Sequence, residues 1–161
     1  MPGIRHIHYG FSLLILMFLI SMLFSCDSSG TFDEMKRIHE SNWNRQEKFS
    51  FDFTITDTAA YYNVYVQIRN TTDYPYSNLF LFLTTKDPSG NLSKDTLECL
   101  LAAPDGKWLG KGMGKLKDNR VLIKKDFRWN TAGNYQLTIE QAMRKEILSG
   151  IADIGLRIEK Q

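Results

Sequence analysis

The chain has 161 residues, of which 43% are hydrophobic, 12% aromatic and 24% charged. Its 20 basic and 18 acidic residues nearly cancel, so it lacks the broad positive field that gathers nucleic acid. The length is enough for one domain with a hydrophobic core. We therefore expect one globular domain and no nucleic-acid partner.

The first 25 residues are typical of an export signal. A mildly basic start that contains Arg5 precedes an apolar run from Phe11 to Phe24. A helix of this length reaches about 21 Å, which is short of a hydrocarbon core of about 30 Å. We expect a signal helix that is removed rather than a permanent membrane span.

The apolar run ends in Leu23-Phe24-Ser25-Cys26, which resembles the lipobox of bacterial lipoproteins. The cysteine sulfur takes the lipid, and the small Ser25 gives the signal peptidase access to the bond before Cys26. Phe24 is bulkier than the usual residue at its position. The alternatives are an ordinary signal peptide or an uncleaved anchor, with Cys26 incidental. We predict that Cys26 carries acyl chains such as palmitate, and two or more chains hold a protein stably on a membrane.

Residues 26–48 are polar and are expected to form a tether after the lipid site. The stretch from Ser28 to Gly30 is typical of a flexible linker. A short helical turn is expected further on, and Trp43 is expected to dock the segment on the domain. The folded domain is predicted to occupy residues 49–161.

From residue 49 the hydrophobic pattern has period two, which indicates β-strands. The predicted strands lie at 49–56, 63–69, 79–83, 95–101, 121–129, 135–139 and 154–158. The third is apolar on both faces, as in a strand that is covered on both sides. Only 141–148 has helical spacing. Seven to eight short strands separated by turns predict an all-β fold, a single antiparallel β-sandwich of jelly-roll or Ig-like type with one short helix.

The sequence lacks the residue combinations on which most hydrolases and metalloenzymes depend. After the signal segment His39 is the only histidine, so no histidine pair can bind zinc, and a Ser-His-Asp relay would need a side chain from the tether. The stretch 106–115 (GKWLGKGMGK) departs from a phosphate-binding loop, because glycine stands where the motif requires Ser or Thr. We predict no enzyme, no catalytic residues, no metal and no cofactor. The 18 acidic residues leave a carboxylate pair open as an alternative.

Aromatic residues supply the candidate binding surface. Tyr74, Tyr76 and Trp108 are candidates for binding a protein partner or a glycan, because an exposed ring can stack on a sugar or anchor an interface. The alternative for each is packing within the domain, and Trp108 with Leu109 is expected to dock the glycine-rich connection on the domain. Cys99 is expected to be a small buried hydrophobic residue.

Several segments in order along the chain resemble the gliding motility lipoprotein family GldH of Bacteroidetes. They are Tyr74 to Leu81, Asp95 to Leu97, Gly106 to Gly112 and Ile154 to Glu159, together with the lipobox cysteine. The resemblance covers nearly the whole mature chain and implies a cell-envelope lipoprotein needed for gliding. It implies work beside other gliding proteins and the type IX secretion machinery, and Cys26 is the only functional residue that it carries over.

The sequence thus predicts a membrane-anchored, non-enzymatic binding or assembly component of the gliding machinery. We expect it on the periplasmic face of the outer membrane, with the inner membrane as the alternative. The alternative function is a lipid-anchored glycan-binding module of the periplasm or cell surface.

Overall fold

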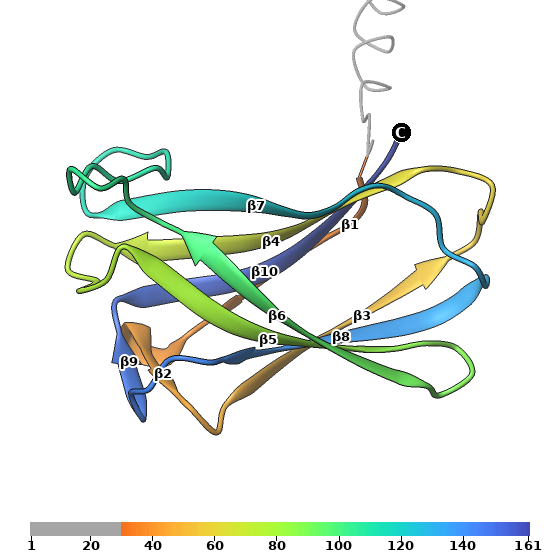
Figure 1. Ribbon diagram of the computed structural model, residues 1–161, viewed down its shortest axis with the longest axis horizontal. Coiled ribbons are helices and arrows are strands. Elements are labelled where there is room, and N and C mark those ends of the chain that lie inside the picture. The colour runs from red at the N-terminus through yellow and green to blue at the C-terminus, as the bar shows by residue number, and fades with distance from the viewer. Residues whose placement is uncertain (1–29) are drawn as a thin grey trace, which may run out of the picture.

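The computed structural model describes residues 30–161, so the predicted signal helix and Cys26 lie outside the described residues. The described part is built from antiparallel strands, in agreement with the predicted all-β class. Two four-stranded sheets have the orders β1-β10-β4-β7 and β3-β8-β5-β6, and β2 pairs with β9 in a separate ribbon (Figure 1). No helix within residues 30–161 is long and apolar enough to cross a membrane.

In chain order the elements are β1 (Gly30–Arg37), the 3-10 helix η2 (His39–Ser41), β2 (Asn42–Asn44), β3 (Lys48–Ile55), β4 (Tyr62–Thr71), β5 (Asn78–Lys86), β6 (Leu92–Leu100), β7 (Leu116–Phe127), β8 (Gly133–Gln141), β9 (Ile147–Ser149) and β10 (Ile151–Lys160). Among these elements, β5 and β6 are the only strands that are consecutive in the chain and paired directly. Most connections therefore cross from one sheet to the other, and the two sheets share one hydrophobic core.

Strict alternation of burial in β3, β4 and β8 builds this core. Phe51, Val66 and Ile139 are completely buried, whereas their neighbours in the sequence face outward. Burying each such side chain stabilises the fold by about 1.5–3 kcal/mol. Trp129, which shares the parity of Val121 and Ile123 in the predicted strand 121–129, is buried, and Cys99 is buried as predicted.

The structure differs from the predicted tether from residue 30 onward. Gly30–Arg37 forms β1, which pairs with β10 from Gly30 opposite Glu159 to Arg37 opposite Asp153. The sequence pattern did not predict this strand because β1 is rich in polar residues. An edge strand can contain them since one of its faces meets solvent. Trp43 is fully buried, as expected, and its Nε1 donates to the carbonyl oxygen of Glu47 at 3.0 Å.

The helix predicted over residues 141–148 is wrong. Gln141 ends β8 and Leu148 lies in β9. The buried Gln141 amide organises the turn between them: its Nε2 donates to the carbonyl oxygen of Lys145 at 2.9 Å, and its Oε1 accepts from the backbone N–H of Met143 at 2.9 Å. One side chain thus satisfies a backbone N–H and a backbone carbonyl of the turn.

Irregular pairing explains the exposure of Lys125, which has the same parity as Val121 and Ile123 in the predicted strand 121–129. The register of β7 against β4 shifts twice between Tyr62 and Tyr65. Such bulges add a residue to one strand and change which side chains face inward. Lys125 is consequently exposed, and the next residue, Asp126, has a positive φ of 46°.

The pairings define two ends of the domain. Gly30, Lys160 and Phe127 lie at one end, because Gly30 pairs beside Lys160, and Tyr62 is opposite both Lys160 and Phe127. We call this the Gly30 end. The opposite end, here the far end, holds the β4–β5 connection, the β6–β7 connection and the β2–β9 ribbon (Figure 1).

Candidate interaction surface

Two connections at the far end are bonded to one another through their backbones. The N–H groups of Leu101 and Ala102 donate to the carbonyl oxygen of Ser77 at 2.8 and 3.0 Å. Thr72 N donates to the carbonyl oxygen of Lys115 at 2.7 Å. The β4–β5 connection (72–77) and the β6–β7 connection (101–115) therefore form one ordered surface.

The glycine-rich part of the β6–β7 connection projects as a small hairpin. Lys111 and Asp118 exchange two backbone hydrogen bonds, of 2.9 and 2.7 Å. Gly112 and Gly114 within it have positive φ values of 133° and 74°, and a Cβ on Gly112 would meet the carbonyl oxygen of Leu116 at 2.6 Å. Glycine is needed there for the turn. Strand β7 follows, rather than the helix that a phosphate-binding loop precedes.

Exposed apolar side chains concentrate on this connection and its flanks. Leu100, Leu109, Met113 and Leu116 are four of the eight large hydrophobic side chains exposed within residues 30–161, and Met113 is 99% exposed. Exposed lysines surround them, at positions 107, 111 and 115. We call these seven residues the far-end surface. Leu109 was predicted to dock on the domain, and that prediction is wrong, because the residue is 55% exposed.

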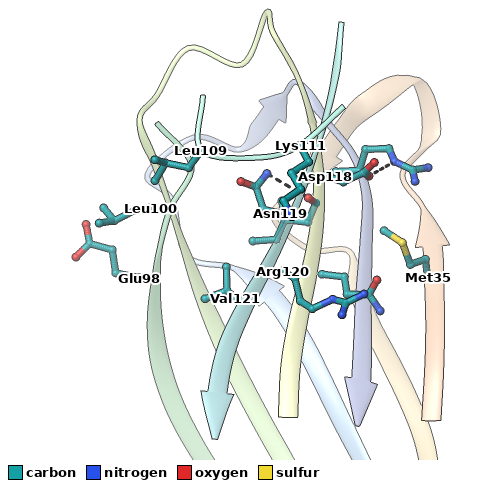
Figure 2. A pocket seen from close by; sticks show the side chains of 12 residues that line it. Met35, Glu98, Leu100, Leu109, Lys111, Asp118, Asn119, Arg120 and Val121 are labelled. Carbon is teal, nitrogen blue, oxygen red and sulfur yellow. Dashed lines mark hydrogen bonds and ion pairs between the residues drawn. The ribbon is translucent and has the colours of Figure 1, made fainter. Parts of the chain in front are cut away.

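A hollow of about 950 Å³ lies beneath the connection (Figure 2). Figure 2 shows Leu100 and Leu109 on one side of it, and Lys111 and Asp118 on the other. The carboxylate of Asp118 accepts from Nε of Arg69 at 2.5 Å, and this bond raises the pKa of the Arg69 guanidinium. Much of the charge in the hollow is thus already paired within the protein.

A buried polar side chain, that of Asn119, lines this hollow. It is buried, and its Nδ2 donates to Oδ1 of Asn70 at 2.8 Å. Asn70 is also buried and donates to the carbonyl oxygen of Thr71 at 2.9 Å. The amide pair therefore fixes β7 beside β4 and serves the fold, since buried polar groups require partners.

The structure brings together two of the three aromatic candidates. The rings of Tyr74 and Tyr76 meet edge to face, with centroids 5.6 Å apart. Tyr74 is buried, its hydroxyl donates to the carbonyl oxygen of Asn78 at 2.8 Å, and burial raises the pKa of the phenol. Its ring therefore has no free face for a ligand.

The other two candidates keep part of their surface in solvent. Tyr76 is half-buried and lines a second hollow, of about 550 Å³, with Phe80 and Met143. Trp108 is half-buried, packs against the core and forms an antiparallel bridge with Ala102. Whether either ring binds a partner or a glycan stays a prediction.

Side chains that bind metal ions do not gather in the part of the chain that the structure describes. Residues 30–161 hold no group of three or more His, Cys, Asp or Glu side chains that could bind a metal ion. His39 is exposed on η2. Burial raises the pKa of the Cys99 thiol to about 12, so it is protonated at neutral pH and is a poor nucleophile.

Sequence reasoning missed the apolar part of the far-end surface, and Met113 most of all. The signal was present in the stretch 111–115, where a large apolar residue stands between glycines and lysines. Such a residue has no strand or helix to turn it inward, so it stays in solvent.

Fold and surface together define an all-β antiparallel domain with an ordered basic and apolar end. Residues 30–158 match the family model of the GldH lipoprotein. The gliding motility lipoprotein GldH homolog of Christiangramia forsetii is 39% identical over 157 residues, 93% of this chain and 96% of that protein. The gliding motility lipoprotein GldH of Flavobacterium johnsoniae is 37% identical over 154 residues, 91% of this chain and 95% of that protein. The chain belongs to the GldH lipoprotein family.

Membership makes the chain a gliding-motility lipoprotein, anchored to a membrane of the cell envelope. Among solved structures, dimeric latent PorU from Porphyromonas gingivalis aligns with 81% of this chain and 13% of its own, at 10% identity. Its TM-score of 0.33 is too low to carry an argument about fold or function.

Proposed function

We propose that this lipoprotein is a non-enzymatic binding component of the gliding machinery, held to the envelope by lipid on Cys26. Its far-end surface binds a protein of the same envelope, in the gliding or type IX secretion apparatus. The observation that carries the proposal is the 99% exposure of Met113 at the tip of an ordered hairpin. An exposed large apolar side chain on a rigid support is typical of an interface anchor.

The chemistry of the surface indicates the partner. Leu109, Met113 and Leu116 each release about 1.5–3 kcal/mol when fully buried, and methionine adapts its shape to the pocket that it enters. Lysines surround them, and neither Lys107 nor Lys111 takes part in an ion pair within residues 30–161. The fitting partner surface is an apolar pocket with an acidic rim.

We also propose a fold type and a location for the protein. If β2 and β9 are left out, the order of the eight long strands fits a jelly-roll sandwich, in which two Greek keys form two antiparallel sheets. We place the protein on the periplasmic face of the outer membrane. The lipobox supports an anchored protein outside the cytoplasm.

Complementation of a deletion strain tests the binding role. Deletion should abolish colony spreading in a gliding host. Wild-type protein should restore it, and Met113→Asp should not, because a carboxylate cannot enter an apolar pocket. The matched control is Leu122→Asp, since Leu122 is 43% exposed on β7 outside the far-end surface.

The amount of each variant in washed membranes is measured beside spreading. Normal gliding of the deletion strain would refute the motility role. Full restoration by Met113→Asp at wild-type levels would refute the binding surface.

The second candidate function is glycan binding, favoured by the hollow at Tyr76. Its walls include two aromatic rings, Tyr76 and Phe80, with Arg144 and Lys145 beside them. Aromatic faces stack on sugars, and the basic groups can donate hydrogen bonds to hydroxyls or acid groups. Tyr76→Ala should then abolish binding to an envelope glycan on an array, and Trp108→Ala should weaken it. Absence of binding by the wild-type protein to any envelope glycan would discard this candidate.

A further inference from the structure

Only a short piece of chain separates the lipid site from the domain. Asp27, Ser28 and Ser29 stand between Cys26 and Gly30, where β1 begins. Fully extended, such a piece spans at most about 14 Å, at ~3.3–3.6 Å per residue. If Cys26 carries the lipid, which is part of the proposed function, the start of β1 lies within that distance of the bilayer surface.

The Gly30 end carries aromatic and basic side chains suited to a lipid surface. Tyr61 is 49% exposed, and the guanidinium carbon of Arg128 lies 5.4 Å from its ring centroid. Nζ of Lys124 lies 4.5 Å from the ring centroid of Phe127, and Lys125 is exposed beside it. We call Tyr61, Lys124, Lys125 and Arg128 the proximal patch. Tyrosine favours the interface between water and lipid, and long basic side chains reach head groups.

The positive charge of the proximal patch is not neutralised within the domain. Lys124, Lys125 and Arg128 join none of the ion pairs formed among the residues that the structure describes. The acidic groups at this end are engaged elsewhere. Asp57 binds Nζ of Lys160 at 2.8 Å, and Asp87 accepts from the backbone and side chain of Asn91 at 2.8 Å each. Asp126, which lies in the same strand as Lys124 and Lys125, opposes the three cations.

The outer face of the first sheet is a poorer surface for lipid. Its arginines are already bound: Arg157 to Asp33 and Glu159, Arg120 to Glu159 and Arg69 to Asp118. If this face lay on lipid head groups, ion pairs within the protein would be replaced by ion pairs with lipid, with little gain in binding free energy. The far-end surface is also basic and apolar, but β7 separates it from the Gly30 end by about 40 Å, at ~3.3 Å per residue.

We propose that the domain stands on its Gly30 end, with the proximal patch in contact with the phospholipid head groups of the bilayer that holds the anchor. The far-end surface then points away from this bilayer, toward the protein partner. The occupant of the patch is a lipid surface and not a second protein, because the short tether keeps Gly30, at the same end of the domain, within about 14 Å of the bilayer.

Spin labels on the lipidated full-length protein test this orientation. The protein is placed in vesicles of phosphatidylethanolamine and phosphatidylglycerol through its own anchor. Thr131→Cys reports on the Gly30 end and Met113→Cys on the far end, and both positions are exposed. Cys99 is buried and its thiol is protonated, so the label goes to the introduced cysteine.

Collision with a water-soluble nickel chelate and with lipid-soluble oxygen is measured at each label. At position 131 the chelate should be excluded and oxygen enriched, whereas position 113 should match a fully aqueous label. Lys124→Glu with Lys125→Glu should open position 131 to the chelate, because each lysine lost weakens attraction to an anionic surface by about fivefold. The matched control, Lys107→Glu with Lys111→Glu at the far end, should leave both readings unchanged.

Mass spectrometry of the N-terminal peptide from the same sample separates the two ways of failing. Equal aqueous accessibility at both positions, with lipid present on Cys26, would overturn the orientation and leave the proposed function standing. Exclusion of the chelate at position 113 instead would also overturn it, in favour of a far end that touches the bilayer. An unmodified Cys26 would refute the anchor and the orientation together.

Discussion

Cys99 shows how far burial changes the chemistry of a single residue. It faces the core from β6, and its thiol pKa of about 12 lies well above the ordinary 9.0 because burial disfavours the thiolate. The unfolded chain releases the thiol proton near pH 9, whereas the folded chain keeps it. Stability should therefore fall with pH between these two values, by up to about 1.4 kcal/mol per pH unit from this group.

Urea unfolding at pH 8 and pH 10 measures this loss. Cys99→Ala is the matched variant: it costs stability at both pH values by leaving a small cavity, and it has no thiol to titrate. The stability advantage of wild type over the variant should shrink by about 1.4 kcal/mol from pH 8 to pH 10. An advantage that stays constant would show that the thiol titrates alike in both states.

Burial of single residues could be predicted from the sequence where the backbone is extended. Phe51, Leu81 and Trp129 were predicted inward by parity or by apolar runs and are buried. For Tyr74, packing within the domain was the alternative that the structure bears out, whereas Leu109 was predicted wrongly; both lie in connections. Alternation with period two predicts the direction of a side chain only within a strand. In a connection, the turns and hydrogen bonds of that connection determine which side chains are buried.

Local composition misled the sequence reading at two elements. β1 has the polar residues of a tether because one of its faces meets solvent and its stability comes from backbone pairing with β10. Residues 141–148 have the spacing of a helix, but the Gln141 side chain bonds the turn there. At β1 a tertiary pairing outweighs the local pattern, and at 141–148 local side-chain hydrogen bonds do so.

Gly150 joins β9 to β10 at the far end and has no room for a side chain. Its φ is +97°, its N–H donates to the carbonyl oxygen of Ser41 at 2.8 Å, and an added Cβ would lie 2.7 Å from Cα of Tyr74. Gly150→Ala should therefore combine backbone strain with a clash against backbone that cannot move freely. We expect a loss of about 2–4 kcal/mol in the free energy of unfolding.

Gly90 provides the control for this prediction. Its φ is +88°, but no atom lies within 4 Å of an added Cβ. Gly90→Ala should cost only the strain, about 1–2 kcal/mol. Chemical denaturation of both variants gives the comparison, and equal losses would show that the contact with Tyr74 does not constrain the far end.

At the scale of the whole molecule, the proposals assign different tasks to the two ends of one domain. With lipid on Cys26 as proposed, a few residues would tie the Gly30 end to the anchor, and the far end presents Met113 on bonded connections. The all-β class and the family could be predicted from strand periodicity and from ordered sequence segments. The far-end surface could not, because it lies in one connection whose exposed residues are set by its turns and by its backbone bonds to the β4–β5 connection.

Photo-crosslinking in intact cells tests the central claim, that the far-end surface binds an envelope protein. A photoreactive amino acid replaces Met113 in one strain and Leu122 in another, with the lipid anchor intact in both. Irradiation should yield a discrete adduct with one envelope protein from position 113 and none from position 122. No adduct from position 113, or the same adducts from both positions, would contradict the account.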